Sequence, residues 1–139
     1  MGIKEKHLND KDEYDLLLAC VLGEAEGEPL LGKLAVACVV RNRVINKRWP
    51  DNYKDVLLQY KQFSCFLPQY LRPEIFVKQR QDPAWRECNF AAFGVYHDWI
   101  QDVTLGSNHY YATTLNNPPS WAEGKHPVLR MGGHIFFKL

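Results

Sequence analysis

The sequence lacks an excess of charge of either sign. Lysine and arginine together number 17, and aspartate and glutamate together number 16, which leaves a formal net charge of +1. A chain this close to neutral has no strong electrostatic attraction to nucleic acid, so no nucleic-acid partner is expected. Neutrality does not exclude a polysaccharide, because sugars are bound through hydrogen bonds and ring stacking rather than through charge.

Long apolar runs are also missing. No stretch reaches the length that a membrane-spanning helix needs, and residues 1–15 lack the apolar core of a secretory signal peptide. We therefore expect no stable membrane insertion, and synthesis in the cytoplasm of a bacterial host. If the substrate lies outside the inner membrane, a holin-type partner has to breach that membrane before the protein reaches the cell wall.

Cysteine is sparse and shows no metal-binding or redox pattern. Cys20, Cys38, Cys65 and Cys88 form no CxxC pair and have no zinc-ligand spacing. The first two fall on apolar helical stripes, where a free cysteine behaves as a small buried hydrophobe, so we expect all four to be reduced. HExxH and HxH motifs are absent from the sequence as well, and neither a metal nor another cofactor is expected.

The composition is that of one ordinary globular domain. Of the 139 residues, 46% are hydrophobic and 24% are charged, which excludes disorder, and this length fits a single core. The sequence has no internal repeat and no Gly/Ser linker. We therefore expect a loose polar arm over residues 1–12, followed by one monomeric domain over residues 13–139.

Three long helices and a short one are expected before residue 106. Apolar residues at helical spacing predict them, and Asp, Asn and Pro at capping positions mark their starts. The expected ranges are Asp10 or Asp12 to about Ala25, 29–46, 56–59 behind a cap at Asn52, and Asp82-Pro83 to about Gln101 with Trp99 on its buried face. Residues 60–73 are expected to form a loop.

The character of the chain changes after Gly106. Residues 109–113 and 135–138 have the composition of short strands, and a loop rich in Pro and Gly separates them over residues 116–133. Helices first and a small sheet last indicate the α+β class.

The segment LGEAEGEP carries glutamates at positions 24, 26 and 28. Glutamate is nearly always exposed, and a solvated helix end explains Glu26 well. Glu24 differs, because it continues the apolar stripe of Leu17, Cys20 and Val21 at the carboxyl end of its helix. The helix dipole and the apolar neighbours both disfavour a negative charge there, so we expect this carboxyl to keep its proton. Cleavage of a glycosidic bond requires such a proton donor.

Residues 19–44, ACVLGEAEGEPLLGKLAVACVVRNRV, resemble the motif of the SleB-type cell-wall hydrolases. That family includes spore cortex-lytic enzymes and phage endolysins. Further matches follow in the same order: Trp49, QFSC at 62–65 with Pro68, GSNHYYA at 106–112, PPSWA at 118–122 and GGHIFFK at 132–138. The QFSC and PPSWA segments resemble phage members more than spore enzymes.

The resemblance implies a lysozyme-like fold, in which a helical lobe faces a small antiparallel sheet across a substrate groove. It also implies that Glu24 is the catalytic acid and that Glu28, the second glutamate of the motif, is a substrate-binding residue. The sequence departs from the common form at Glu26, where an arginine is frequent, so an anion replaces a cation beside the site. Arg43 is a candidate partner of a motif glutamate.

Candidate substrate-binding residues lie on the later motifs. Gln62, Phe63 and Ser64 either line the groove or form an aromatic plug with polar neighbours, and the resemblance favours the groove.

On the expected strand, His109 and Tyr111 share one face and Tyr110 takes the other, so one tyrosine is expected to meet sugar while the other packs. Trp121 is either a stacking platform for sugar or a cover for the core. His109 and His134 are too far apart in sequence to indicate a metal site.

Only Glu24 presents itself as a catalytic carboxylate, which bears on the reaction. An ordinary glycosidase uses two carboxyl groups. A lytic transglycosylase needs one, because the C6 hydroxyl of muramic acid itself attacks the anomeric carbon. We therefore expect an endolysin-like lytic transglycosylase that cleaves the MurNAc–GlcNAc β-1,4 bond of peptidoglycan. A hydrolytic muramidase with a second carboxylate from Glu28, Asp98, Asp102 or Glu123 stays open, as do a zinc amidase or peptidase and a non-catalytic wall-binding module.

Overall fold

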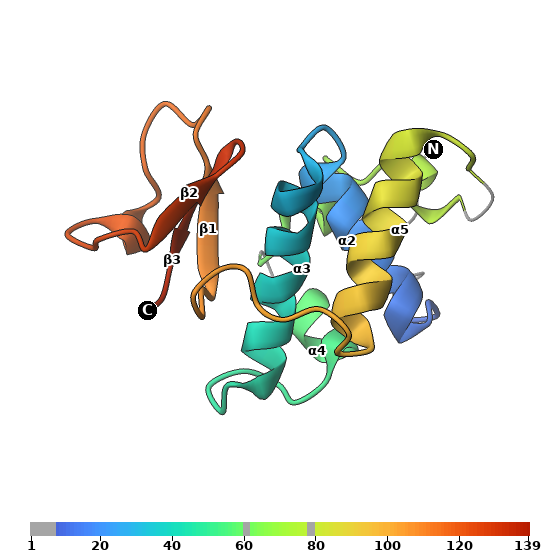
Figure 1. Cartoon of the computed structure of the whole chain (residues 1–139), viewed down its shortest axis with the longest axis horizontal. Coiled ribbons are helices and arrows are strands. Elements are labelled where there is room, and N and C mark those ends of the chain that lie inside the picture. The colour runs from blue at the N-terminus through green and yellow to red at the C-terminus, as the bar shows by residue number, and fades with distance from the viewer. Residues whose placement is uncertain (1–7, 60–61, 78–79) are drawn as a thin grey trace.

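The computed structural model describes residues 8–59, 62–77 and 80–139. The chain is mostly helical, and its end forms a three-stranded antiparallel sheet. Three long helices pack together, and the sheet lies beside one of them, α3 (Figure 1). These helices are α2 (Glu13–Ala25), α3 (Leu30–Ile45) and α5 (Pro83–Tyr96). The predicted α+β class is confirmed.

The first two long helices begin and end close to the predicted positions. The side chain of Asp12 accepts a hydrogen bond from the backbone N–H of Tyr14 and caps α2, as the sequence predicts. Pro29 occupies the position before α3, so this helix is one residue shorter at each end than the predicted range 29–46. Both helices are buried over most of their length, which matches their apolar composition.

The short helix α4 (Tyr53–Leu57) starts three residues before the predicted range 56–59. Asn52 is its cap, as predicted, and its side-chain oxygen accepts a hydrogen bond from the N–H of Asp55 at 2.8 Å. This bond fixes the first turn immediately after the cap, which is why the helix begins at residue 53.

Helix α5 is capped by Asp82 as predicted but ends at Tyr96 rather than near Gln101. The backbone of Asp98 adopts a left-handed φ of 58°, and the N–H groups of Trp99 and Ile100 both return to the carbonyl of Gly94. The chain therefore leaves the helix axis before Trp99. The prediction that Trp99 lies on the buried face is wrong, since 74% of this residue is exposed.

The sheet contains one strand more than the sequence analysis expected. Strands β1 (His109–Ala112) and β3 (His134–Phe137) lie within one residue of the predicted strands and pair antiparallel. Strand β2 (Leu129–Met131) falls inside the predicted loop 116–133 and pairs with the other side of β3. The turn between β2 and β3 is made by Gly132, with φ +59°, and Gly133. A two-glycine turn of this kind is a hairpin signal that the sequence does contain.

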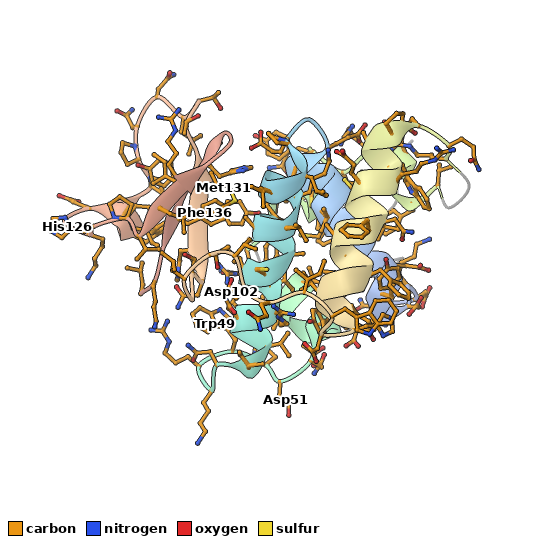
Figure 2. All side chains as sticks on the ribbon, in the orientation of Figure 1. Trp49, Asp51, Asp102, His126, Met131 and Phe136 are labelled. Atoms are coloured by element: carbon orange, nitrogen blue, oxygen red, sulfur yellow. The ribbon has the colours of Figure 1, made fainter. Side chains whose placement is uncertain are left out.

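Two apolar clusters hold the molecule together. The larger one lies among the helices, and the smaller one joins α3 to the sheet through Ala35, Val39 and Phe136. Figure 2 shows Phe136 and Met131 on the side of the sheet that faces α3. His126, in the loop before β2, lies on the side of the molecule away from the helices. The smaller cluster therefore fixes the position of the sheet relative to the helices.

A buried lysine joins three parts of the helical region. Lys33 on α3 is 3% exposed, and its Nζ donates to the backbone carbonyl of Glu28 at 2.7 Å and to Glu87 on α5 at 2.8 Å. Burying an ammonium group is costly unless it is paired and hydrogen-bonded, and these two acceptors, one of them a carboxylate, offset that cost. The lysine thereby holds the turn between α2 and α3 against α5.

The predicted loose arm over residues 1–12 lies mostly outside the described residues. Of its described part, Leu8 is 2% exposed and packs in the larger cluster, so the packed chain begins before residue 13. No helix in the described ranges is both long and apolar enough to cross a bilayer.

Candidate active site

Glu24 lies in the last turn of α2, where the helical region meets the sheet. Its carboxylate accepts three hydrogen bonds: from the hydroxyl of Tyr110 at 2.6 Å, from Oγ of Ser64 at 3.1 Å and from the backbone N–H of Cys65 at 3.2 Å. These donors come from β1 and from the turn Ser64–Phe66. The residue as a whole is partly exposed, and the three donors hold its carboxyl in one orientation.

Tyr110 is the donor from the sheet, and its position follows from the strand register. It pairs with Phe136 on β3, and its face of the sheet is the one packed on α3. Burial raises the pKa of Tyr110 well above its ordinary value, and the negative charge of Glu24 acts in the same direction. Tyr110 therefore stays protonated at neutral pH and remains a hydrogen-bond donor.

The loop 62–65 lies beside Glu24, but its three candidate residues have different roles. Ser64 is exposed and donates to Glu24, and Gln62 is exposed as well. Phe63 is 2% exposed and packs in the larger cluster. The groove-lining prediction is therefore wrong for Phe63, because a side chain with so little exposed surface cannot contact a glycan; it is the aromatic plug of the alternative interpretation.

Arg43 is the residue whose role the sequence analysis missed. It is 4% exposed, and its guanidinium carbon lies over the rings of Trp49 and Phe63, at 5.4 Å and 5.2 Å from their centroids. Its guanidinium donates to the carbonyl of Asn108 at 2.8 Å and to Oε1 of Gln62 at 3.0 Å. The expected pairing with a motif glutamate is wrong, because these neutral oxygens and the two rings surround the cation.

The contacts of Arg43 join the two segments that hold Glu24. Asn108 precedes Tyr110 by two residues, and Gln62 precedes Ser64 by two residues. Burial lowers the pKa of Arg43 from its ordinary value, which leaves it charged at neutral pH because an arginine starts so high. A single buried cation therefore sets the spacing between the strand and the loop whose hydroxyls reach Glu24.

Glu28 contacts the sheet rather than Glu24. Its Oε1 accepts a hydrogen bond from the N–H of Gly133 at 2.6 Å and lies 3.6 Å from Nδ1 of His134. A Cβ built on Gly132 would collide with the same oxygen. These contacts indicate that Glu28 positions the β2–β3 turn against the start of α3.

Glu26, the middle glutamate of the motif, is paired with cations from another segment. Arg80 contacts it at 3.1 Å and Arg72 at 3.8 Å, and Arg80 also pairs with Asp82 at 2.8 Å. The carboxylate of Glu26 is thus matched by two arginines from the segment before α5.

The remaining aromatic candidates lie on the outer face of the sheet. The ring of Trp121 lies 4.9 Å from that of His109, 5.9 Å from Tyr111 and 5.2 Å from Phe137. Burial, followed by the charges of Arg43 and Arg48, lowers the pKa of His109 to about 4, so this histidine is neutral at pH 7. The strand alternation places this cluster on the face opposite Tyr110.

The same alternation separates the two histidines considered for a metal. His109 belongs to the outer face and His134 to the face turned toward α3. Within the described ranges, no group of three His, Cys, Asp or Glu side chains is placed to hold a metal ion.

Other acidic candidates are held by other contacts. Asp98 lies 3.4 Å from Arg41, and its side chain is 80% exposed. Asp102 accepts hydrogen bonds from the backbone N–H groups of Thr104 and Gly106 and from the side chain of Asn42. Burial raises the pKa of Asp102, but these hydrogen bonds together outweigh it, so the pKa lies below its ordinary value. Among the residues that the structure describes, neither side chain is hydrogen-bonded to Glu24 or to one of its three donors.

Comparison with known proteins identifies residues 27–137 as matching a family described as Cell Wall Hydrolase. The spore cortex-lytic enzyme of Halalkalibacterium halodurans is 29% identical over 131 residues, which cover 90% of this chain and 34% of that protein. The spore cortex-lytic enzyme of Bacillus cereus is 28% identical over 130 residues, which cover 92% of this chain and 45% of that protein. The chain therefore spans less than half the length of these curated relatives.

Solved structures show the same fold. The crystal structure of the catalytic domain of the Bacillus cereus SleB protein matches with a TM-score of 0.69 and 25% identity, over 91% of this chain and 89% of that one. The catalytic domain of the germination-specific lytic transglycosylase SleB from Bacillus anthracis matches with a TM-score of 0.70 and 23% identity, over 91% and 93%. The predicted lysozyme-like fold is confirmed.

The contact between Gly23 and Cys65 gives a test of how the loop is held. A Cβ on Gly23 would collide with Cβ of Cys65 and lie 2.9 Å from its Sγ. We expect Gly23→Ala to lower the free energy of unfolding by about 1–3 kcal/mol, because the loop has to move away from α2. Chemical denaturation measures this change.

Gly27 provides the matched control, since a Cβ there would meet no atom of the described residues within 4 Å beyond its chain neighbours. Gly27→Ala should change the free energy of unfolding by less than about 0.5 kcal/mol. Equal losses in the two variants would show that the close approach of Gly23 and Cys65 is not what holds the loop.

Proposed function

The chain belongs to the cell wall hydrolase family, and we propose that it degrades peptidoglycan as a lytic transglycosylase, with Glu24 as the catalytic acid. The bond cleaved is the β-1,4 link between MurNAc and GlcNAc. The observation that carries the proposal is the convergence of Tyr110, Ser64 and Cys65 on the carboxyl of Glu24. Glu24 lies just before the range matched by the family model, so its assignment depends on this geometry and on the motif.

The proposed reaction uses one carboxyl group twice. Glu24 donates its proton to the leaving GlcNAc oxygen as the C1–O bond breaks. The C6 hydroxyl of MurNAc then attacks C1, and its proton passes to Glu24, which regenerates the acid without consuming water. Donors that orient a catalytic carboxyl support such a cycle, because proton transfer requires a fixed distance and direction.

The arrangement of the other carboxylates favours this mechanism over hydrolysis. An ordinary glycosidase needs a second carboxyl group facing the first across the bond. Glu28 is bound to Gly133, Asp98 lies beside Arg41, and Asp102 caps its own turn. A hydrolytic muramidase would therefore have to free one of these groups or use Glu123.

Substrate contacts follow from exposure around Glu24. Gln62 and Ser64 are exposed beside the acid and are proposed to bind the glycan. Tyr110 acts through Glu24, and Glu28 acts through the hairpin turn. His109, Tyr111 and Trp121 lie on the outer face of the sheet, so any sugar that they bind lies away from the scissile bond.

Glutamine substitutions separate the three glutamates of the motif. We expect Glu24→Gln to lower lysis of permeabilised cells at least about 100-fold, because the amide cannot donate a proton in this way. Glu28→Gln should lower activity less, since it weakens a bond to the turn, and Glu26→Gln least. Turbidity loss measures activity, and a thermal melt confirms that each variant is folded. A folded Glu24→Gln protein that keeps more than about a tenth of the activity would refute its role as the acid.

The reaction products distinguish the two mechanisms. A lytic transglycosylase leaves 1,6-anhydro-MurNAc ends, which have no reducible group. Fragments from purified sacculi should therefore keep their mass after borohydride treatment, as mass spectrometry measures. If most fragments gain two hydrogens instead, water is the nucleophile, and Glu28 and Asp98 are the first candidates for the second carboxylate.

The setting in which the protein meets the wall is a further part of the proposal. We propose an endolysin role, supported by the QFSC and PPSWA segments, which resemble phage members. In that role a holin-type partner opens the membrane and the protein acts as a monomer.

Expression alone should then permit bacterial growth, and lysis should follow only when chloroform or a holin disrupts the inner membrane. Optical density during expression measures this. Lysis without disruption, with the protein recovered from the periplasm, would contradict the endolysin role.

A further inference from the structure

The side-chain amide of Gln62 has a fixed orientation. Its Oε1 accepts a hydrogen bond from a guanidinium nitrogen of Arg43 at 3.0 Å. Arginine has only donors, so the amide oxygen must face it and the amide NH₂ must face away. Because Arg43 is 4% exposed and also bound to Asn108, it cannot follow the amide if the amide turns.

The amide NH₂ is available to a ligand beside the candidate acid. Gln62 is exposed, and it precedes Ser64, which donates to Glu24 at 3.1 Å. The other segment held by Arg43 leads to Tyr110, which donates to the same carboxylate. A glycan bound at Glu24 therefore passes next to the amide NH₂ of Gln62, which can only donate hydrogen bonds.

We propose that Arg43 makes Gln62 a specificity residue that selects glycans with an N-acetyl group at the sugar bound there. This inference rests on the proposed function, since it concerns the same glycan. A hydroxyl group can donate or accept, so an NH₂ donor does not select for it. An acetamido carbonyl only accepts, whereas a de-N-acetylated sugar carries an ammonium group that only donates. The fixed NH₂ of Gln62 favours the first and opposes the second.

Gln62→Glu tests the proposal without removing the partner of Arg43. The new carboxylate pairs with the buried guanidinium, so the melting temperature should not fall. It has no NH₂ to offer, and its negative charge favours an ammonium group. The matched control is Gln101→Glu, the same change at an exposed glutamine after α5.

Binding is measured first, in the Glu24→Gln background, so that the result does not depend on cleavage. The probes are peptide-free glycan strands, either fully N-acetylated or chemically de-N-acetylated. We expect the protein with Gln62 to prefer the acetylated strands at least about tenfold, and Gln62→Glu to weaken their binding about tenfold and abolish the preference. Gln101→Glu should keep the preference. Equal binding of both strands by the protein with Gln62, or an unchanged preference in Gln62→Glu, overturns the proposal.

Kinetics with Glu24 intact then separate binding from chemistry. Gln62→Glu should raise KM on acetylated strands about tenfold and change kcat less. Arg43→Lys keeps the charge but replaces the two nitrogens that bind Asn108 and Gln62 by a single one, so the amide becomes free to turn and the preference should shrink. If that variant does not fold, Gln62→Glu alone decides. Acetyl-selective binding without any cleavage by the unsubstituted protein would refute the proposed function and leave this inference standing.

Discussion

The hydrogen bond from Tyr110 to Glu24 connects the two parts of the molecule at the point where its chemistry is proposed. It can form only if β1 lies in the right register, if the sheet is pressed against α3 by Phe136, and if α2 extends to Ala25. Each of these conditions belongs to a different part of the chain. The carboxyl is therefore placed by the whole fold rather than by the motif around it.

The buried cation of Arg43 supports this arrangement through its bonds to the strand segment and to the loop. A guanidinium group is costly to bury, and Arg43 meets that cost with two neutral oxygens and two aromatic faces rather than with a carboxylate. A carboxylate partner would have placed another anion near Glu24. Because the partners of Arg43 are neutral, the donors from the loop and from the strand remain directed at the carboxylate of Glu24.

The sequence predicts the elements with strong local signals and misses those set by distant contacts. Asp12, Asn52 and Asp82 each cap the helix that the sequence assigns to them, because capping involves only the next few residues. The early end of α5 depends on one left-handed residue, and the pairing of β2 depends on β3, which follows it. For the candidate site, Glu24 is predicted as the acid from its place on an apolar stripe, and this assignment stays a proposal. The role of Arg43 does not, since its partners lie 19 and 65 residues away.

The contact of Glu28 with the two-glycine turn has a consequence for protein engineering. Gly132 needs a positive φ, and the space where its side chain would stand is filled by the carboxylate of Glu28. Glu28 and Gly132 are separated by most of the chain, but each can be accommodated only together with the other. A chimera that grafts the hairpin of a relative onto these helices, or the reverse, has to transfer the turn and the glutamate together.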